Sequence, residues 1–171
     1  MRDYHEEERI AALRSYGMLD TPAELEFDHI VQEAAREFDA PIALVSLVDD
    51  DRQWFKARVG LDVSHTPRSM SFCTHAIQGP DVLVIKNAQH DERFADNSLV
   101  TGDPNIRFYA GAPLKTPEGR RIGTLCVIDR TPREGLTHEQ KAKLEALAER
   151  TMEAFARRQK RRALIGDTRA A

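Results

Sequence analysis

Apolar residues recur at helical spacing in two stretches of the amino-terminal part of the chain. In the first they fall at Ile10, Leu13 and Tyr16, and Gly17 supplies a stop, which predicts a short helix. In the second, Thr21–Glu24 has the sequence of a capping box with proline at the first helical position, which predicts a helix start. An apolar stripe on one face of this helix follows, formed by Phe27, Ile30, Val31, Ala34, Ala35 and Phe38.

A third helical pattern fills the carboxyl-terminal part of the chain. Thr137–Gln140 is another capping-box sequence, and the predicted helix runs from there to about Arg162. After Phe155 the run Ala156–Arg162 is basic and lacks a wide apolar face, so we expect this end to project from the core as a solvated helix or connector. Positive charge also suits the carboxyl end of a helix, so the basic run does not require nucleic-acid binding. The apolar face of this helix comprises Leu144, Leu147, Thr151, Ala154 and Phe155.

Two segments between the helical patterns are predicted to form hairpins. Ile42–Val48 is apolar on both faces, as in a central strand, and Asp49–Arg52 reads as the turn into a second, alternating strand. Tyr109–Leu114 and Ile122–Asp129 predict the other hairpin. Pro113 cannot donate to a ladder, which suggests an edge position or a bulge near the end of its strand.

The segment from Leu61 to Phe108 is irregular. One short strand is predicted at Val82–Ile85, and short helices are predicted around Cys73–Gln78 and Asp91–Ala95. Long loops inside a compact domain are more often functional than accidental, so we expect the functional site in this region.

The order of these elements predicts one α+β domain, with a mainly antiparallel central sheet of five or six strands and the terminal helices packed on one face. We expect one domain over residues 1–171, with its core in 6–160 and a basic helix end and tail in 156–171. The net charge of −3, with 41% hydrophobic and 31% charged residues, indicates a globular protein with no bulk field that recruits nucleic acid or membrane.

The compartment and the cysteine count bear on redox and metal chemistry. No apolar run reaches the roughly 18 to 20 residues of a bilayer span, and the amino terminus lacks a secretory pattern, so we expect a cytoplasmic protein. Cys73 and Cys126 are therefore expected as thiols, and they are too few for a four-ligand zinc site. The spacings of His65, His75 and His90 match no metal signature, so no metal site is predicted.

Five sequence blocks occur in an order that is more specific than any single motif: Leu19–Pro22, Ala40–Asp49, Ser71–Ile77, Ile106–Gly111 and Ile122–Asp129. Over residues 6–160 they resemble the GAF sensor domains of bacterial signalling proteins. The resemblance implies a sheet with helices on one face, a pocket roofed by irregular segments on the other, and dimerisation through the terminal helices. In that family the domain commonly precedes a diguanylate cyclase or histidine kinase. Because 171 residues leave no room for either, we expect the output to be another signalling protein.

The resemblance does not identify the ligand or a cofactor. Cyclic-nucleotide binding members carry an Asn-Lys-Phe-Asp-Glu set that is missing here, and no glycine-rich phosphate loop is present. Bilin-binding members attach the chromophore through a cysteine followed directly by histidine. Here Thr74 separates Cys73 from His75, and Val127 follows Cys126, so a bilin is not expected.

Aromatic and arginine side chains in the irregular region suggest a binding pocket. Arginine offers a planar fork of donors to an anionic group, and neighbouring aromatics supply apolar walls. An equally open alternative is that Arg93 pairs with Asp91 or Asp96 while Phe94 fills the core. The ligand-binding residues predicted from this reasoning are Phe72, Cys73, His75, Arg93, Phe94, Arg107 and Tyr109.

Three functions stay open at this point. The preferred hypothesis is a non-catalytic sensor that binds a small ligand or a partner and relays the event through its terminal helices. A related branch of the family reduces free methionine sulfoxide with a catalytic and a resolving thiol. Cys73 fits the first role because it stands near a helix start with His75 and Arg68 close by, whereas Cys126 reads as a buried strand residue. The third possibility is a ligand-free dimerisation module.

Overall fold

The computed structural model describes residues 4–170, and the side chains of residues 5–165. Its helices are α1 (Tyr4–Ser15), α2 (Leu25–Glu37), α3 (Cys73–Ala76), α4 (Ser98–Thr101) and α5 (His138–Ala170), with short 3-10 turns at Arg68–Met70 and Ala88–His90. Its strands are β1 (Ile42–Val48), β2 (Arg52–Val59), β3 (His65–Pro67), β4 (Leu83–Ile85), β5 (Phe108–Lys115) and β6 (Arg121–Asp129).

Within residues 4–170, six strands form one antiparallel sheet in the order β3-β2-β1-β6-β5-β4. The central strand β1 is buried along its whole length, as its unbroken apolar sequence predicts. Both predicted hairpins are present, and the predicted α+β fold with a mainly antiparallel sheet is confirmed. Pro113 lies beyond the three residues of β5 that pair with β4, so its missing N–H leaves that side of the ladder intact.

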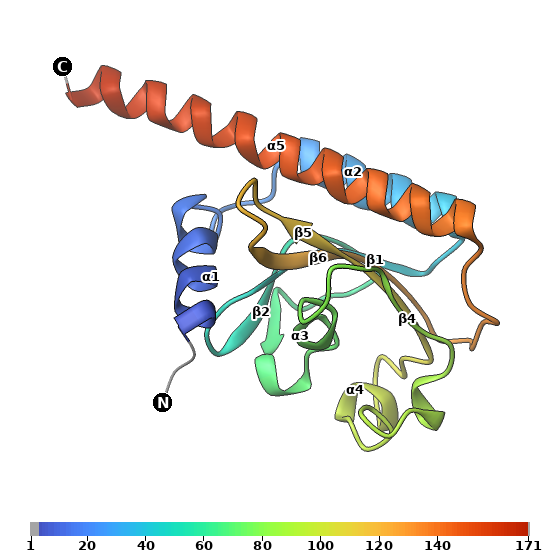
Figure 1. Ribbon diagram of the computed structural model, residues 1–171. Helices are drawn as coiled ribbons and strands as arrows, with labels where there is room; N and C mark the ends of the chain where they lie inside the picture. The colour runs from blue at the N-terminus through green and yellow to red at the C-terminus, as the bar shows by residue number, and fades with distance from the viewer. Residues whose placement is uncertain (1–3, 171) are drawn as a thin grey trace.

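Helices cover one face of this sheet and short irregular segments cover the other. The helices α2 and α5 lie side by side, α2 over β1 and β2 and α5 over β5 and β6 (Figure 1). The predicted stripe of α2 is confirmed, since Phe27, Ile30, Val31 and Ala34 are buried in the core beneath the helices. Helix α1 packs near the end of the sheet, where Arg9 Nη1 donates a 2.7 Å hydrogen bond to Val48 O.

The two capping-box sequences have different fates. Before α5, Thr137 N donates to Gln140 Oε1 at 2.8 Å and Gln140 N donates to Thr137 Oγ1 at 3.1 Å, so this box forms as predicted. The box predicted at Thr21–Glu24 is wrong: α2 begins at Leu25, and Glu24 makes no side-chain cap bond.

Lys56 explains why the first box does not form. Its side chain is fully buried on β2, and Nζ donates to Thr21 Oγ1 and Pro22 O, both at 2.7 Å, and to the Glu24 carboxylate. Burial lowers the pKa of Lys56, and the bond to Glu24 opposes that change. A buried ammonium without acceptors costs more free energy than an uncapped helix end. Thr21 and Glu24 therefore accept hydrogen bonds from Lys56 and do not cap α2.

The expectation that the basic run Ala156–Arg162 is solvated is wrong for Arg158, whereas the other residues of the run are exposed as predicted. Arg158 is buried and its Nε donates to Glu24 Oε2 at 2.8 Å. Arg162 Nη1 donates to Gly17 O at 2.7 Å, and Arg157 pairs with Glu26. Cationic side chains thus meet carbonyls at the carboxyl end of α1 and carboxylates at the start of α2, which the helix dipoles favour.

Beyond Arg162, α5 continues past the body of the domain to Ala170 (Figure 1). Leu164 and Ile165 are exposed on this extension. Although α5 has 33 residues, no helix within residues 4–170 is both long and apolar enough to cross a membrane.

The irregular region is only partly as predicted. Helix α3 and strand β4 occur where expected, but residues 92–96 form turns instead of the predicted helix at Asp91–Ala95. Asp91 Oδ1 accepts a 2.9 Å bond from Arg93 N, a local contact that competes with helix formation. The helix comes later, at α4, where Asn97 Oδ1 caps Leu99 N at 2.9 Å. Strand β3 was not predicted.

Candidate functional site

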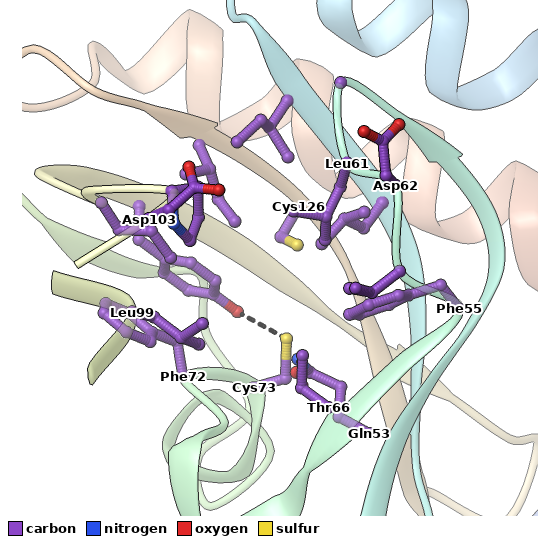
Figure 2. A pocket seen from close by; sticks show the side chains of 18 of the residues that line it. Gln53, Phe55, Leu61, Asp62, Thr66, Phe72, Cys73, Leu99, Asp103 and Cys126 are labelled. Carbon is purple, nitrogen blue, oxygen red and sulfur yellow. Dashed lines mark hydrogen bonds between the residues drawn. The ribbon is translucent and has the colours of Figure 1, made fainter. Parts of the chain in front are cut away.

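A cavity of about 270 Å³ lies on the face of the sheet opposite α2 and α5. Strands β1, β2, β5 and β6 form its floor, and α3, α4 and the segment that links β2 to β3 form its walls (Figure 2). Its interior is mostly apolar, with side chains that include Ile42, Leu44, Phe55, Phe72, Leu99, Ile106 and Ile128.

Strand alternation decides which side chains reach this cavity. On β1, Ile42 and Leu44 face it, whereas Ala43 and Val45 pack beneath the helices. Strand β6 follows the same rule and brings Cys126 to the cavity. Successive side chains of a strand point to opposite faces, so one sheet serves both the helix core and the cavity.

Two thiols line the cavity. Cys73, at the start of α3, has its Sγ atom 3.2 Å from Tyr109 Oη and 3.0 Å from Thr124 Oγ1. The thiol of Cys126 is a neighbour of this cluster, whereas the buried hydroxyl of Ser46 has no hydrogen-bond partner among the described residues. Both cysteines are buried, free thiols, and Figure 2 shows both side chains in the lining of the cavity, with the bond from Cys73 to the tyrosine hydroxyl dashed.

These contacts shift the pKa values of the cluster in opposite directions. Burial opposes ionisation of Cys73, but the neighbouring Cys126 thiol and the hydroxyls of Thr124 and Tyr109 outweigh it and lower its pKa to about 7. The hydrogen bond with Cys73, together with burial, raises the pKa of Cys126 well above its ordinary value. Burial and the nearby thiols raise the pKa of Tyr109. Of the three groups, Cys73 is therefore the one that ionises at the lowest pH.

The remaining polar groups form one wall and the mouth of the cavity. Ser71 Oγ donates to Gln53 Oε1 at 2.7 Å, and Gln53 Nε2 donates to Thr66 Oγ1 at 3.1 Å, which fixes the amide. The exposed carboxylates of Asp62 and Asp103 stand across the mouth from one another (Figure 2). Sequence reasoning missed Gln53 and Thr66 because their contact joins β2 to the three-residue strand β3, which has no periodic signal.

The predicted site residues other than the two arginines fall into two groups. Phe72, Cys73 and Tyr109 line the cavity. Behind them, Phe94 stacks on Phe72 with ring centroids 4.1 Å apart, and His75 meets the edge of the Phe94 ring at 4.9 Å. Burial, with a smaller effect of Arg93, lowers the pKa of His75. This second group supports the wall and does not line the cavity.

The two predicted arginines are occupied by the protein itself. Arg93 forms an ion pair with Asp91 at 2.8 Å, which is the alternative that the sequence left open. Arg107 Nη1 donates to Val100 O at 2.8 Å and to Ile106 O at 3.0 Å. Neither guanidinium lines the cavity, so the arrangement does not favour the small anionic ligand for which they were considered. Among residues with described side chains, no three His, Cys, Asp or Glu residues come close enough to hold a metal ion.

Comparison with known families identifies the domain family to which the chain belongs. The GAF domain model matches residues 22–155. The chain therefore belongs to the GAF domain family, a signalling sensor fold.

Individual relatives agree with this assignment. The chain is 48% identical over 147 residues to a cyclic di-GMP phosphodiesterase of Pseudomonas aeruginosa, which covers 86% of this chain but only a quarter of that relative's length. The GAF domain of an Acinetobacter phosphoenolpyruvate-protein phosphotransferase superposes with a TM-score of 0.61 at 17% identity, covering 92% of this chain and 96% of that one. A free methionine-R-sulfoxide reductase of Neisseria meningitidis gives 0.63 at 17% identity and 95% coverage of both chains. At such low identity these structures establish a shared fold alone.

Proposed function

We propose that this GAF domain is a non-catalytic sensor that binds a small molecule in the cavity and relays binding through its helices. The observation that carries the proposal is the cavity of about 270 Å³, whose floor belongs to the same strands that α2 and α5 cover from the other face. Ligand sites are typically concave and mostly apolar with a few placed polar groups, and this cavity has that composition.

The lining favours a small, partly apolar ligand with a polar group at one end. Apolar side chains fill most of the interior, whereas carboxylates at Asp62 and Asp103 and the guanidinium of Arg130 flank the mouth. A ligand therefore inserts its apolar part toward β1 and β6 and keeps its charged or hydrogen-bonding part near solvent. The volume suits a small metabolite and not a dinucleotide or tetrapyrrole.

Strand β2 offers a short route from the cavity to α5. Phe55 lines the cavity, and the next residue, Lys56, lies on the helix side. Lys56 binds Glu24, which in turn binds Arg158 of α5. A shift of β2 on ligand binding alters this chain of contacts, and couplings of this kind are typically worth about 1 to 3 kcal/mol.

The output of the sensor is part of the same proposal. We expect a homodimer through the terminal helices and contact with a signalling partner, because α5 extends beyond the domain with exposed Leu164 and Ile165. The Pseudomonas relative, a cyclic di-GMP phosphodiesterase, supports a role in the regulation of a signalling enzyme.

A second candidate function is thiol-dependent reduction of a small sulfoxide. The observation in its favour is that Cys73 and Cys126 line the same cavity. In that reaction the sulfoxide oxygen leaves as water, the substrate becomes a thioether, and the two thiols become a disulfide. A reductase of the Neisseria type shares the fold, but the thiols alone do not establish turnover.

Native mass spectrometry of freshly purified protein tests the sensor proposal. We expect a retained small molecule that is lost in Leu99→Trp, which fills the cavity, and kept in Leu25→Trp, where the side chain is exposed. A dimer with an empty cavity in the wild type would overturn ligand sensing in favour of a dimerisation module. Sustained reduction of free methionine sulfoxide by the wild type and not by Cys73→Ser would overturn the non-catalytic assignment.

A further inference from the structure

The two cysteines of the chain are 53 positions apart in sequence, yet the fold places both thiols in the lining of one cavity. Cys73 belongs to α3, which roofs the sheet, and Cys126 belongs to β6 in its floor. Each side chain is at most 1% exposed, but both line a cavity large enough for water-sized molecules. A small polar reagent can therefore reach sulfur atoms that larger reagents cannot.

The groups in hydrogen-bond contact with Cys73 Sγ are hydroxyls, which stabilise a thiolate. The hydroxyl groups of Tyr109 and Thr124 lie 3.2 Å and 3.0 Å from its Sγ atom. The charged groups that line the same cavity, Asp62, Asp103 and Arg130, lie at its mouth. A thiolate held in this way is nucleophilic, and its neighbour Cys126 stays protonated.

We propose that Cys73 and Cys126 form a redox pair that small hydroperoxides oxidise to an intramolecular disulfide. The Cys73 thiolate attacks one peroxide oxygen, the O–O bond breaks, and Cys73 becomes a sulfenic acid while the leaving oxygen takes a proton to form water or an alcohol. The Cys126 thiol then attacks the sulfenic sulfur, an S–S bond forms, and the hydroxyl leaves as a second water. Two thiols and one hydroperoxide thus give a disulfide and two molecules of water, or water and an alcohol.

Oxidation also changes the cavity. In the reduced protein Cys73 Sγ holds contacts to β5 through Tyr109 and to β6 through Thr124. A bond to Cys126 moves this sulfur and with it the start of α3, which carries the cavity wall residue Phe72 immediately before it. The redox state of the pair therefore sets the shape of the cavity, whichever ligand the cavity takes.

Thiol counting after addition of one equivalent of hydrogen peroxide tests the proposal. We expect the wild type to lose both thiols and the mass of two hydrogen atoms, with a Cys73–Cys126 linked peptide that dithiothreitol reverses. Cys126→Ser should stop at a sulfenic acid that a cyclic 1,3-diketone traps, and Cys73→Ser should leave Cys126 reduced. The rate in the wild type should rise with pH through about 7, where Cys73 ionises.

Variants that keep both thiols guard against misreading a folding defect. Tyr109→Phe removes one donor to Cys73 and should slow oxidation several-fold, whereas Tyr16→Phe, a buried tyrosine in the helix core, should leave the rate unchanged. Oxidation of the folded wild type no faster than that of Cys73→Ser, or disulfides formed only between chains, would overturn the proposal. Ligand retention in native mass spectra is read separately on Cys126→Ser, so loss of the redox pair and loss of sensing are distinguishable.

Discussion

The two faces of the sheet differ in how they are packed, although the same strands form both. On the helix face, α2 and α5 close a core in which Phe155 meets Phe27 edge-on at 5.1 Å, and buried Lys56 has three acceptors. The cavity face is assembled from short segments, retains an open volume, and holds a polar cluster around Cys73. Both faces bury apolar side chains, but the cavity face keeps open a volume that dense packing would fill.

The largest difference between the faces should appear when one buried ring is removed from each. Phe155→Ala deletes a fully buried ring that contacts Phe27 and Tyr16, and we expect a loss of about 3 to 5 kcal/mol in the free energy of unfolding. Phe72→Ala should cost about 2 to 3 kcal/mol, because its ring already borders the open volume of the cavity. Urea unfolding of both variants measures the difference, and equal losses would contradict the contrast.

An intermediate effect is expected from the buried charge on the helix face. Glu24→Gln removes the carboxylate that serves both Lys56 and Arg158, and we expect a loss of about 2 kcal/mol because the lysine stays buried without a counter-charge. The matched control is Glu33→Gln, which breaks an exposed pair with Arg150 and should change stability by less than about 1 kcal/mol. Comparable losses in the two variants, measured by chemical denaturation, would show that the buried lysine does not depend on Glu24.

The smallest effect concerns Glu6 on α1, next to the end of the sheet. Hydrogen bonds from Arg9 and Arg68, only partly opposed by burial, lower the pKa of Glu6 from 4.5 to about 2. Because the folded state stabilises the ionised form of Glu6, its contribution to the free energy of unfolding is complete above pH 4.5 and is lost as the pH falls toward about 2. Glu6→Gln should flatten stability across that window in acid titrations, whereas Glu7→Gln, at an exposed neighbour, should not.

Long periodic elements were predictable because their signals are local. The apolar stripe of α2 predicts one buried face, and the unbroken apolar run of β1 predicts a strand buried on both faces. The structure confirms both predictions. The same reasoning failed at Thr21–Glu24 and Arg158, where a residue more than 30 positions away along the chain decides the local arrangement. Neither the partner nor its burial can be read from a capping-box pattern.

The candidate site was predictable only where a residue both lies in the irregular region and faces the sheet. Phe72 and Cys73 meet that condition, Tyr109 reaches the cavity from strand β5 itself, and Arg107 bonds to carbonyls of its own loop. Cys126 was read as a buried strand residue, and it is one, but the face to which it points makes it part of the cavity. Pairing between β1 and β6 sets that face, and pairing is a long-range property of the chain.

The length of α5 turns a small rotation into a large displacement. At 1.5 Å per residue its 33 residues span about 50 Å, and its base rests on β5 and β6 while its tip extends beyond the body of the domain. A tilt of about 5° at the base therefore carries the tip about 4 Å, roughly the rise of three helical residues. Rearrangements too slight to disturb the sheet itself become, at the far end of this lever, large enough to bring exposed Leu164 and Ile165 into a new register with whatever they contact.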